Sequence, residues 1–355
     1  MRTPVPTPAE APISHAIRRL AQGESLSVGE TADAFGVVVR GEASAPLTAA
    51  LLMALRVKGE TAQEVAGAVR ALRTAMVPLL VNADGLVDTC GTGGGAVSTL
   101  NVSTAAAFVV AGAGVRVAKH GNRSYTSRSG SADVLEALGV DIALAPDAAA
   151  GVLDRVGLVF LFAPTYHPAM RHVAPARREL GVPTIMNLLG PLLNPAGTRR
   201  QVVGVADRGR APVVAGALAE LGADHALVVH ADVGMDEISP LGATRCWEVR
   251  GGGVREWVLD PATLDLAAGE LLSLAGAEPA QNAERLEALF LGRSDRAVRC
   301  AVLLNAAAAL YVSGKGWSLA ESATRAAESL DCGAAHQTLT ELRRAAPAGD
   351  SGTAR

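Results

Sequence analysis

The sequence predicts an α/β protein, in which a small all-helical N-terminal domain precedes a larger α/β domain with a mostly parallel central sheet. Helical periodicity with cap signals runs up to about Pro78, and after Leu79 short apolar runs alternate with helical runs. The chain has 355 residues, 49% of them hydrophobic, which is enough for two cores. We expect a helical domain at 13–78, an α/β domain at 79–345, and disordered ends at 1–12 and 346–355.

The helical domain is predicted from two capping signals and the apolar runs that follow them. Ser27 with Glu30, and Thr61 with Glu64, have the spacing of a capping box, in which side chains satisfy the first N–H groups of a helix. Helices are expected over 47–57 and 61–76. The pattern fits a lobe of an enzyme and an interaction or dimerisation module equally well.

The larger domain is predicted from five apolar runs of strand length with helical runs between them. Ligands of such sheets bind beyond the carboxyl ends of the strands, so the loops that follow the strands are the places to look for a site. The expected strands are 86–88, 115–118, 159–162, 201–205 and 225–230.

Two polar, glycine-rich loops lie within residues 88–139. The first, Gly91–Gly95, stands between a predicted strand and a predicted helix, where backbone N–H groups and the helix dipole favour an anion. The second, 119–131, carries three basic side chains and several serines before another helix start. Two neighbouring anion sites indicate one ligand with two phosphate groups. Neither loop has the dinucleotide-binding or Walker A spacing.

Composition excludes several other classes. A net charge of −3 argues against a nucleic-acid binder, and the four scattered cysteines form neither a zinc motif nor a disulfide framework. Cys90 beside the first loop is interpreted as a structural thiol. The N-terminus has no signal-peptide core, and no run of about 18 residues is apolar throughout, so we expect a soluble cytoplasmic protein that binds no membrane.

Four separated motifs, in this order along the chain, resemble the anthranilate phosphoribosyltransferase family. They are Asp-x-x-Gly-Thr-Gly-Gly from Asp88, Asn-x-Ser-Thr from Asn101, Lys-His-Gly-Asn-Arg from Lys119 and Ser-Gly-Ser-Ala-Asp from Ser129. The run from Asn187 to Pro195 is similar as well, and the resemblance extends over nearly the whole chain. It implies the nucleoside phosphorylase/phosphoribosyltransferase type of fold, with part of 165–197 packed on the helical domain.

The resemblance implies transfer of the phosphoribosyl group of phosphoribosyl pyrophosphate to the amine of anthranilate. The products are N-(5-phosphoribosyl)anthranilate and pyrophosphate, in the second step of tryptophan biosynthesis from chorismate. It also implies a homodimer formed through the helical domain. The donor-binding residues expected by this match are Gly91, Gly94, Gly95, Thr99, Asn101, Val102, Ser103, Thr104, Lys119, His120, Gly121, Asn122, Arg123, Ser124, Tyr125, Thr126, Ser127 and Ser131.

The same resemblance places anthranilate at Gly91, Asn122 and Arg177, because a guanidinium can pair a carboxylate in a bidentate manner. Asp236 and Glu237, with Ser103, match the family's magnesium ligands, and two Mg²⁺ ions per subunit are expected. No catalytic acid or base is expected. An aromatic amine is uncharged at neutral pH, and electrostatic stabilisation of the leaving group carries the reaction.

Two positions depart from the family pattern. Gly95 stands where the family has an aspartate, which suggests an altered magnesium dependence or weaker donor binding, and Tyr125 replaces a smaller residue near the acceptor. Three alternatives therefore stay open. They are a pyrimidine nucleoside phosphorylase, a phosphoribosyltransferase for a different aromatic acceptor, and a non-catalytic regulatory homologue.

Overall fold

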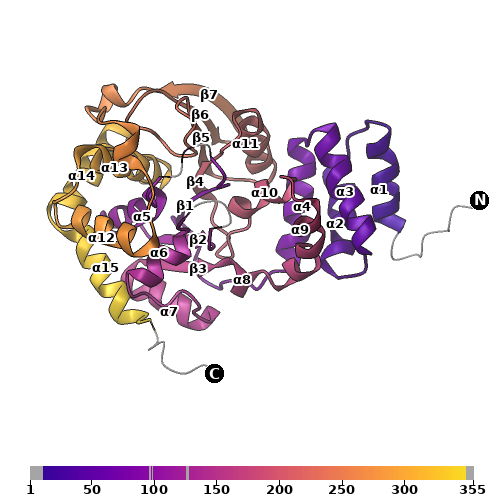
Figure 1. Cartoon of the computed structure of the whole chain (residues 1–355), viewed down its shortest axis with the longest axis horizontal. Helices are drawn as coiled ribbons and strands as arrows, with labels where there is room; N and C mark the ends of the chain where they lie inside the picture. Colours follow the sequence, from indigo (N-terminus) through magenta and orange to yellow (C-terminus); the bar gives the residue numbers. More distant parts are fainter. Residues whose placement is uncertain (1–10, 96, 98, 125–127, 349–355) are drawn as a thin grey trace, which may run out of the picture.

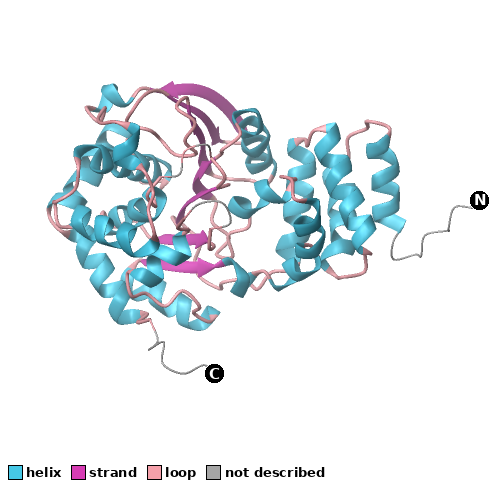
Figure 2. Ribbon diagram, viewed as in Figure 1, coloured by secondary structure: helices cyan, strands magenta, loops and turns pink. Residues whose placement is uncertain are grey.

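A seven-stranded sheet forms the centre of the larger domain in the computed structural model, which describes residues 11–95, 97, 99–124 and 128–348 (Figures 1 and 2). The strand order is β3-β2-β1-β4-β5-β6-β7, with the first five strands parallel and the last two antiparallel. The strands are β1 (Val87–Gly91), β2 (Val117–Gly121), β3 (Leu158–Phe162), β4 (Arg200–Gly204), β5 (His225–Ala231), β6 (Thr244–Arg250) and β7 (Gly253–Leu259).

Each of the five expected strands is present, and the mostly parallel sheet is confirmed. The predicted end of the first strand at Asp88 is wrong, because β1 stays paired with β4 as far as Gly91 opposite Gly204. Strands β6 and β7 were not among those predicted from the sequence. These strands form a hairpin around Gly251 and Gly252, whose φ angles of 58° and 77° favour glycine, and β7 is the sheet edge.

The helical domain confirms both capping boxes. The side chains of Ser27 and Thr61 each accept the backbone N–H three residues on. The carboxylates of Glu30 and Glu64 in turn accept the backbone N–H of Ser27 and Thr61. The expected disorder of residues 1–12 is wrong for Ala11 and Pro12, which form the start of a helix whose residue Ile13 is buried. Residues 1–10 lie outside the described part of the chain. The helices are α1 (Ala11–Ala21), α2 (Val28–Val39), α3 (Ala45–Lys58) and α4 (Ala62–Thr74).

Helices cover both faces of the sheet (Figure 1). Helix α11 and the short α10 lie on the face toward the helical domain, whereas α5, α13, α14 and α15 lie on the other. The bounds are α5 (Val102–Gly112), α6 (Ser131–Ala137), α7 (Pro146–Val156), α8 (Ala163–Tyr166), η1 (Pro168–His172), α9 (Ala174–Leu180), α10 (Met186–Leu189), η2 (Gly190–Leu192), η3 (Arg208–Arg210), α11 (Ala211–Glu220), η4 (Pro261–Leu264), η5 (Leu271–Leu274), α12 (Pro279–Phe290), α13 (Arg296–Val312), α14 (Leu319–Asp331) and α15 (Ala334–Ala345).

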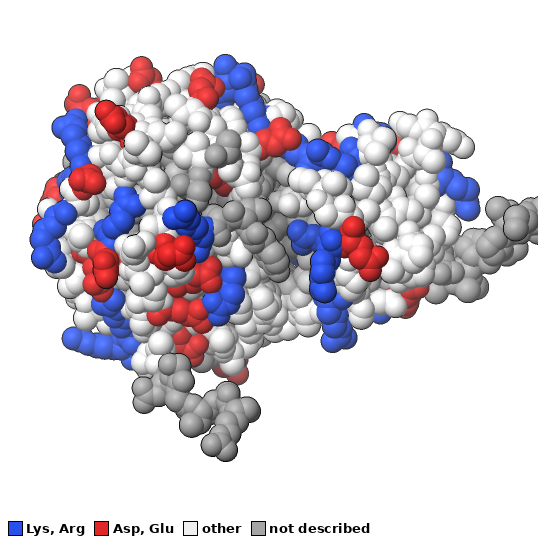
Figure 3. Space-filling model, viewed as in Figure 1, with Lys and Arg blue, Asp and Glu red and all other residues white. Residues whose placement is uncertain are grey.

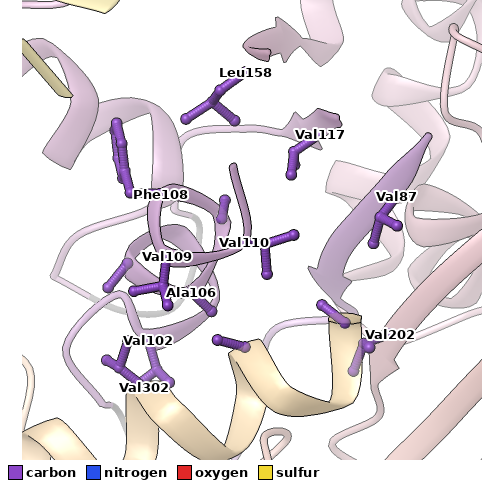
Figure 4. Packing of buried hydrophobic residues seen from close by; sticks show 14 of the residues in the cluster. Val87, Val102, Ala106, Phe108, Val109, Val110, Val117, Leu158, Val202 and Val302 are labelled. Atoms are coloured by element: carbon purple, nitrogen blue, oxygen red, sulfur yellow. The ribbon is translucent and has the colours of Figure 1, made fainter. Parts of the chain in front are cut away.

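The main hydrophobic core is built around α5, which is apolar on nearly all sides. Its residues Ala106 and Val110 lie among strand residues such as Val117 and among side chains of α13 such as Val302 (Figure 4). A helix buried all round in this way is held by tertiary packing, and its position is therefore well defined. The N-terminus of α5 is thus fixed at the carboxyl end of β1.

A second hydrophobic cluster runs without interruption from the helical domain into the sheet. It includes Val65 and Val69 of α4, Val214 of α11, and Val203 and Val228 on the sheet face. The segment between β3 and β4 follows the same border, with η1 against α2, α9 against α3 and α10 against α4. We call this packed border between the two domains the α4–α11 seam.

The predicted disorder from residue 346 is wrong for the three residues that the structure describes there. Ala346 is buried and its carbonyl accepts the N–H of Asp141, while Pro347 forms a bridge with Val140. Backbone pairing therefore holds these residues to the larger domain. Residues 349–355 lie outside the described part of the chain.

Candidate active site

The carboxyl ends of β1, β4 and β5 lie side by side because these parallel strands pair in register, with Gly91 beside Gly204 and Gly204 beside Val229. The first glycine loop follows β1, and the acidic loop 232–237 follows β5. A small pocket lies between the two loops. Its walls are Thr89, Cys90, Ser103, Val202, Gly204, Val229, Asp236, Glu237 and Asn305.

Asp236 sits in a nest of glycines. A Cβ atom added to Gly91 or Gly95 would lie 3.2 Å or 3.1 Å from a carboxylate oxygen of Asp236, and one added to Gly204 would lie 1.6 Å from its backbone carbonyl oxygen. Only glycine allows so close an approach at Gly204. The glycine residues of the first loop and of β4 therefore bring the acidic loop to the start of the predicted phosphate site.

Glu237 points to the N-terminus of α5. Its carboxylate accepts the hydroxyl of Thr99 at 2.7 Å and the backbone N–H of Ser103 at 3.3 Å. Burial and the charge of Asp236 raise the pKa of Glu237 to about 8, and burial also raises the pKa of Asp236. Two carboxylates that resist ionisation together are stabilised by a cation, and their hard oxygen atoms fit Mg²⁺.

Lys119 reaches the same point from β2. Its buried ammonium group donates to the carbonyl of Thr89 and, at 3.2 Å, to the hydroxyl of Ser103. Burial lowers the pKa of Lys119, and the charge of Asp88 acts in the opposite direction. The cation thus stands between the first glycine loop and the first turn of α5, where a departing phosphate group would gain most from it.

Asn101, the N-cap residue of α5, connects the start of this helix to the second loop. Its amide group donates to the carbonyl of Ser129 at 3.0 Å, and its oxygen accepts the Ser129 hydroxyl at 3.2 Å. Within the second loop, the hydroxyl of Ser131 donates to the carbonyl of Asn122 at 3.3 Å. Thr104 is buried, and its hydroxyl has no hydrogen-bond partner among the described residues. The structure therefore brings the two predicted phosphate loops together.

Arg123 differs from the expected phosphate ligand, because its guanidinium binds carboxylates of α6. It donates to Asp133 at 2.9 Å and to Glu136 at 2.5 Å, and it lies 5.7 Å from the ring centre of Phe162. These bonds raise its pKa. Asp133 also accepts the backbone N–H of Ser124. Direct contact between Arg123 and the donor stays a prediction.

The side chain of His120 faces the segment between β3 and β4. Its Nδ1 lies 3.2 Å from the carbonyl of Gly190, and its Nε2 lies 3.2 Å from Nε2 of His167. Burial lowers the pKa of His120 to about 3 and that of His167 to about 4, so both rings are neutral at physiological pH. The backbone N–H of His120 donates to Asp88.

For several of the predicted site residues, the hydrogen bonds described above indicate no role in substrate binding. Arg177 is half-buried on α9 and comes from the segment that packs on the helical domain, and its pairing with anthranilate stays a prediction. The exposed Gly94 adopts a φ of 78°, and Val102 is buried at the start of α5. Tyr125, Thr126 and Ser127 lie outside the described residues.

Three buried polar residues support the site, although the sequence analysis gave them no role. Asn194 and Gln201 donate to the fully buried Asp88, at 2.8 Å and 3.4 Å. Asn305 binds both the N–H and the carbonyl of Ile238, directly after the acidic pair. A single asparagine in the apolar run of α13 was the available signal, because a buried amide needs partners.

A Gly95→Asp variant is expected to bind Mg²⁺ more tightly and to lose thermal stability without it. Its Cβ would lie 3.1 Å from the Asp236 carboxylate, so the new carboxylate adds negative charge to the pair. Differential scanning fluorimetry over a magnesium titration measures both effects. An unchanged magnesium profile would contradict the role given to Gly95.

Comparisons with known proteins agree with this arrangement. Residues 14–76 match the helical bundle domain of a glycosyl transferase family, and residues 83–336 match the a/b domain of that family. The chain is 50% identical over 332 residues to an anthranilate phosphoribosyltransferase of Rubrobacter xylanophilus, covering 94% of this chain and 97% of the relative.

Solved structures give the same result over almost the whole length. The anthranilate phosphoribosyltransferase of Thermus thermophilus superposes with a TM-score of 0.86 at 42% identity, covering 92% of this chain and 99% of that one. The Saccharomyces cerevisiae enzyme in complex with PRPP (phosphoribosyl pyrophosphate) and Mg has a TM-score of 0.85 at 29% identity, with 95% and 98% covered. Another structure of the yeast enzyme contains 4-fluoroanthranilate and has a TM-score of 0.83 at 28% identity, again covering 95% and 98%.

Proposed function

The chain belongs to the anthranilate phosphoribosyltransferase family, and from this premise we propose how its site carries out the reaction. The enzyme transfers the phosphoribosyl group of phosphoribosyl pyrophosphate to the amine of anthranilate, which gives N-(5-phosphoribosyl)anthranilate and pyrophosphate in tryptophan biosynthesis. The observation that carries the proposal is the contact of the acidic loop with the first glycine loop, where Lys119 also ends.

Charge stabilisation is the main task of the site. As the bond from C1 of the ribose to the pyrophosphate breaks, negative charge grows on the departing oxygens and positive charge on the sugar. The ammonium of Lys119 and backbone N–H groups of the first loop stabilise the departing anion. The neutral amine of anthranilate then attacks C1 with its own lone pair and needs no strong base. Holding donor and acceptor together supplies much of the remaining rate.

Magnesium fits the carboxylates of this chain. Asp236 and Glu237, with the hydroxyl of Ser103, would hold Mg²⁺, and we propose two ions per subunit. When bound, the metal neutralises the charge of the pyrophosphate. The raised pKa of Glu237 supports this assignment, because a bound cation would favour the ionised form of both carboxylates at neutral pH.

The direct test is the loss of anthranilate fluorescence on mixing the protein with phosphoribosyl pyrophosphate and increasing Mg²⁺. Magnesium-dependent turnover is expected. Turnover with another aromatic amine but not with anthranilate would indicate a different acceptor. Dependence on a nucleoside and free phosphate would instead indicate a phosphorylase. Bound donor without turnover of any acceptor would indicate a non-catalytic homologue.

An Arg177→Gln variant is expected to raise the KM for anthranilate about tenfold or more, with little change in the KM for phosphoribosyl pyrophosphate. The reason is the loss of one charge-assisted pair with the acceptor carboxylate. Arg178→Gln is the matched control, because Arg178 is the exposed neighbour on the same helix. Equal effects of both variants on both KM values would contradict the assignment.

We also propose that the enzyme is a cytoplasmic homodimer that associates through the helical domain. Val57 on α3 is 80% exposed and so is accessible to a contact between subunits, and all four cysteines are free thiols, as expected in a reducing compartment. Among the described residues, no helix combines the length and hydrophobicity needed to cross a membrane. Light scattering should give twice the mass of the 36.1 kDa chain, and Val57→Glu should shift it toward the monomer.

A further inference from the structure

Asn101 is the N-cap residue of α5. Asparagine is favoured at this position because its side chain can accept an N–H of the first turn, but among the described residues Asn101 makes no such bond to α5. Instead its amide group donates to the Ser129 carbonyl, and its oxygen accepts the Ser129 hydroxyl. The side chain therefore joins the start of α5, which follows the first loop, to the second loop, and its orientation decides whether this connection forms.

A residue far along the chain fixes that orientation. Asn282 on α12 is completely buried, and its amide group donates to the side-chain oxygen of Asn101 at 3.1 Å across 181 positions of sequence. The side-chain oxygen of Asn282 accepts the backbone N–H of Ala277 at 3.0 Å. A backbone N–H can only donate. Rotating the side-chain amide of Asn282 by half a turn would therefore place its NH₂ group against the N–H of Ala277, with two donors facing each other. The oxygen of Asn101 is consequently held toward α12 and its NH₂ group toward Ser129.

The same helix holds the first loop at a second point. Arg285 donates to the carbonyls of Ser273 and Ala275, at 2.5 Å and 2.6 Å. Between these two residues, the carbonyl of Leu274 accepts the N–H of Leu100 at 2.9 Å, one residue before Asn101. Helix α12 thus acts on both the backbone and the side chain at the start of α5.

We propose that Asn282 is a positioning residue for the donor site, which acts through Asn101 and keeps the two phosphate loops at the spacing that one sugar with a phosphate and a pyrophosphate group requires. The inference rests on the proposed function, since it takes both loops to bind phosphate groups of one donor. A supporting residue of this kind changes how well the loops are preorganised and leaves the reacting groups in place. Its loss affects binding of the donor more than the chemical step.

The experiment compares Asn282→Ala, Asn282→Asp, Asn101→Ala and the double variant Asn101→Ala/Asn282→Ala. The KM for phosphoribosyl pyrophosphate is expected to rise about tenfold in Asn282→Ala, which corresponds to one buried hydrogen bond, with kcat and the KM for anthranilate within about twofold. Asn282→Asp keeps the size but sets an oxygen against the oxygen of Asn101, so its effect should be larger. The double variant should match Asn101→Ala alone, because Asn282 acts through that residue.

Ser329→Ala is the matched control. Ser329 is a buried residue whose hydroxyl donates to the backbone carbonyl of Val109 at 2.8 Å, near the other end of α5, so the variant loses a comparable bond without touching the loops. Its melting temperature should also fall, by less than in Asn282→Ala because Asn282 makes two hydrogen bonds, while its donor KM stays unchanged. Equal donor KM values in these two variants, or multiplying effects in the double variant, would overturn the proposal.

Amide hydrogen exchange without substrates separates this inference from the proposed function. Peptides that contain Leu100–Thr104 and Ser129–Asp133 should exchange faster in Asn282→Ala than in Ser329→Ala, whatever reaction the enzyme performs. If the wild-type enzyme shows no turnover but the exchange difference is present, the proposed function fails and the coupling of the loops stands. Equal exchange in these peptides would exclude the coupling itself.

Discussion

A Glu237→Gln variant should lose at least about a hundredfold in kcat/KM while its metal-free form becomes more stable than the wild type. The amide keeps the size of the side chain and can still accept the N–H of Ser103, and the hydroxyl of Thr99 can accept from its NH₂ group. The negative charge that holds Mg²⁺ is removed. The repulsion that raises the pKa of Glu237 is removed with it.

Steady-state kinetics at saturating magnesium and thermal unfolding in EDTA measure the two effects. Asp232→Asn serves as the control, because it removes another carboxylate of the same loop. The side chain of Asp232 is 44% exposed and is paired with Arg245. The control should retain wild-type activity. If Glu237→Gln were as active as the control, Glu237 would have no part in metal binding.

The same variant should change how metal-free stability depends on pH. The folded-state pKa of Glu237 is raised to about 8, whereas an unfolded glutamate titrates near about 4.3, so the folded protein holds the proton more tightly. The resulting stabilisation is complete below the unfolded pKa and is lost as the pH rises through about 8. The melting temperature of the wild type should therefore fall relative to Glu237→Gln between about pH 5 and pH 8. A constant difference would contradict the raised pKa.

A Gly204→Ala variant should reduce kcat/KM by about two orders of magnitude and lower the melting temperature by several degrees. The added methyl group would lie 1.6 Å from the carbonyl oxygen of Asp236, so the acidic loop must leave its place above the sheet. Glu237 would then no longer accept the N–H of Ser103, and Asp236 would move away from the first glycine loop. Kinetics over a magnesium titration, together with thermal unfolding, would show both losses.

Gly29→Ala is the corresponding control. Gly29 lies in the first turn of α2 with ordinary backbone angles, and no atom outside its own helix lies within 4 Å of an added Cβ. Alanine is the better helix former, so stability should rise slightly and activity should stay the same. Wild-type activity in Gly204→Ala would show that the acidic loop can move without cost and that the glycine nest does not position it.

The sequence predicted those parts of the fold whose signals are local. Capping boxes at Ser27 and Thr61 lie within four residues, and the buried parallel strands are short apolar runs. The β6–β7 hairpin was missed because its identity comes from pairing with β5. Glu248 in β6 is polar yet buried, since His225, Arg255 and Tyr311 surround its carboxylate. A buried glutamate of this kind hides the polar and apolar alternation by which β6 could be recognised, although Gly251 and Gly252 marked the turn.

The site divides in the same way. The glycine loop, Lys119 and the acidic pair lie close together, because the two loops follow strands that are recognisable in sequence and Lys119 lies within another such strand. Their binding of the donor stays a prediction. Side-chain direction was not predictable. Arg123 was predicted to bind phosphate, but in the structure it pairs with two carboxylates of α6, those of Asp133 and Glu136. The role of Asn282 could not be predicted either, because its partner is 181 residues away.

The α4–α11 seam has a mechanical consequence. Figure 3 shows a surface hollowed between the two lobes, with charges of both signs on either side, yet the apolar cluster beneath joins α4 to α11 and the sheet without a break. Domains joined by core-like packing melt cooperatively and resist hinge motion. The two lobes are therefore expected to unfold in one transition, and any movement of one lobe against the other has to disturb this apolar packing.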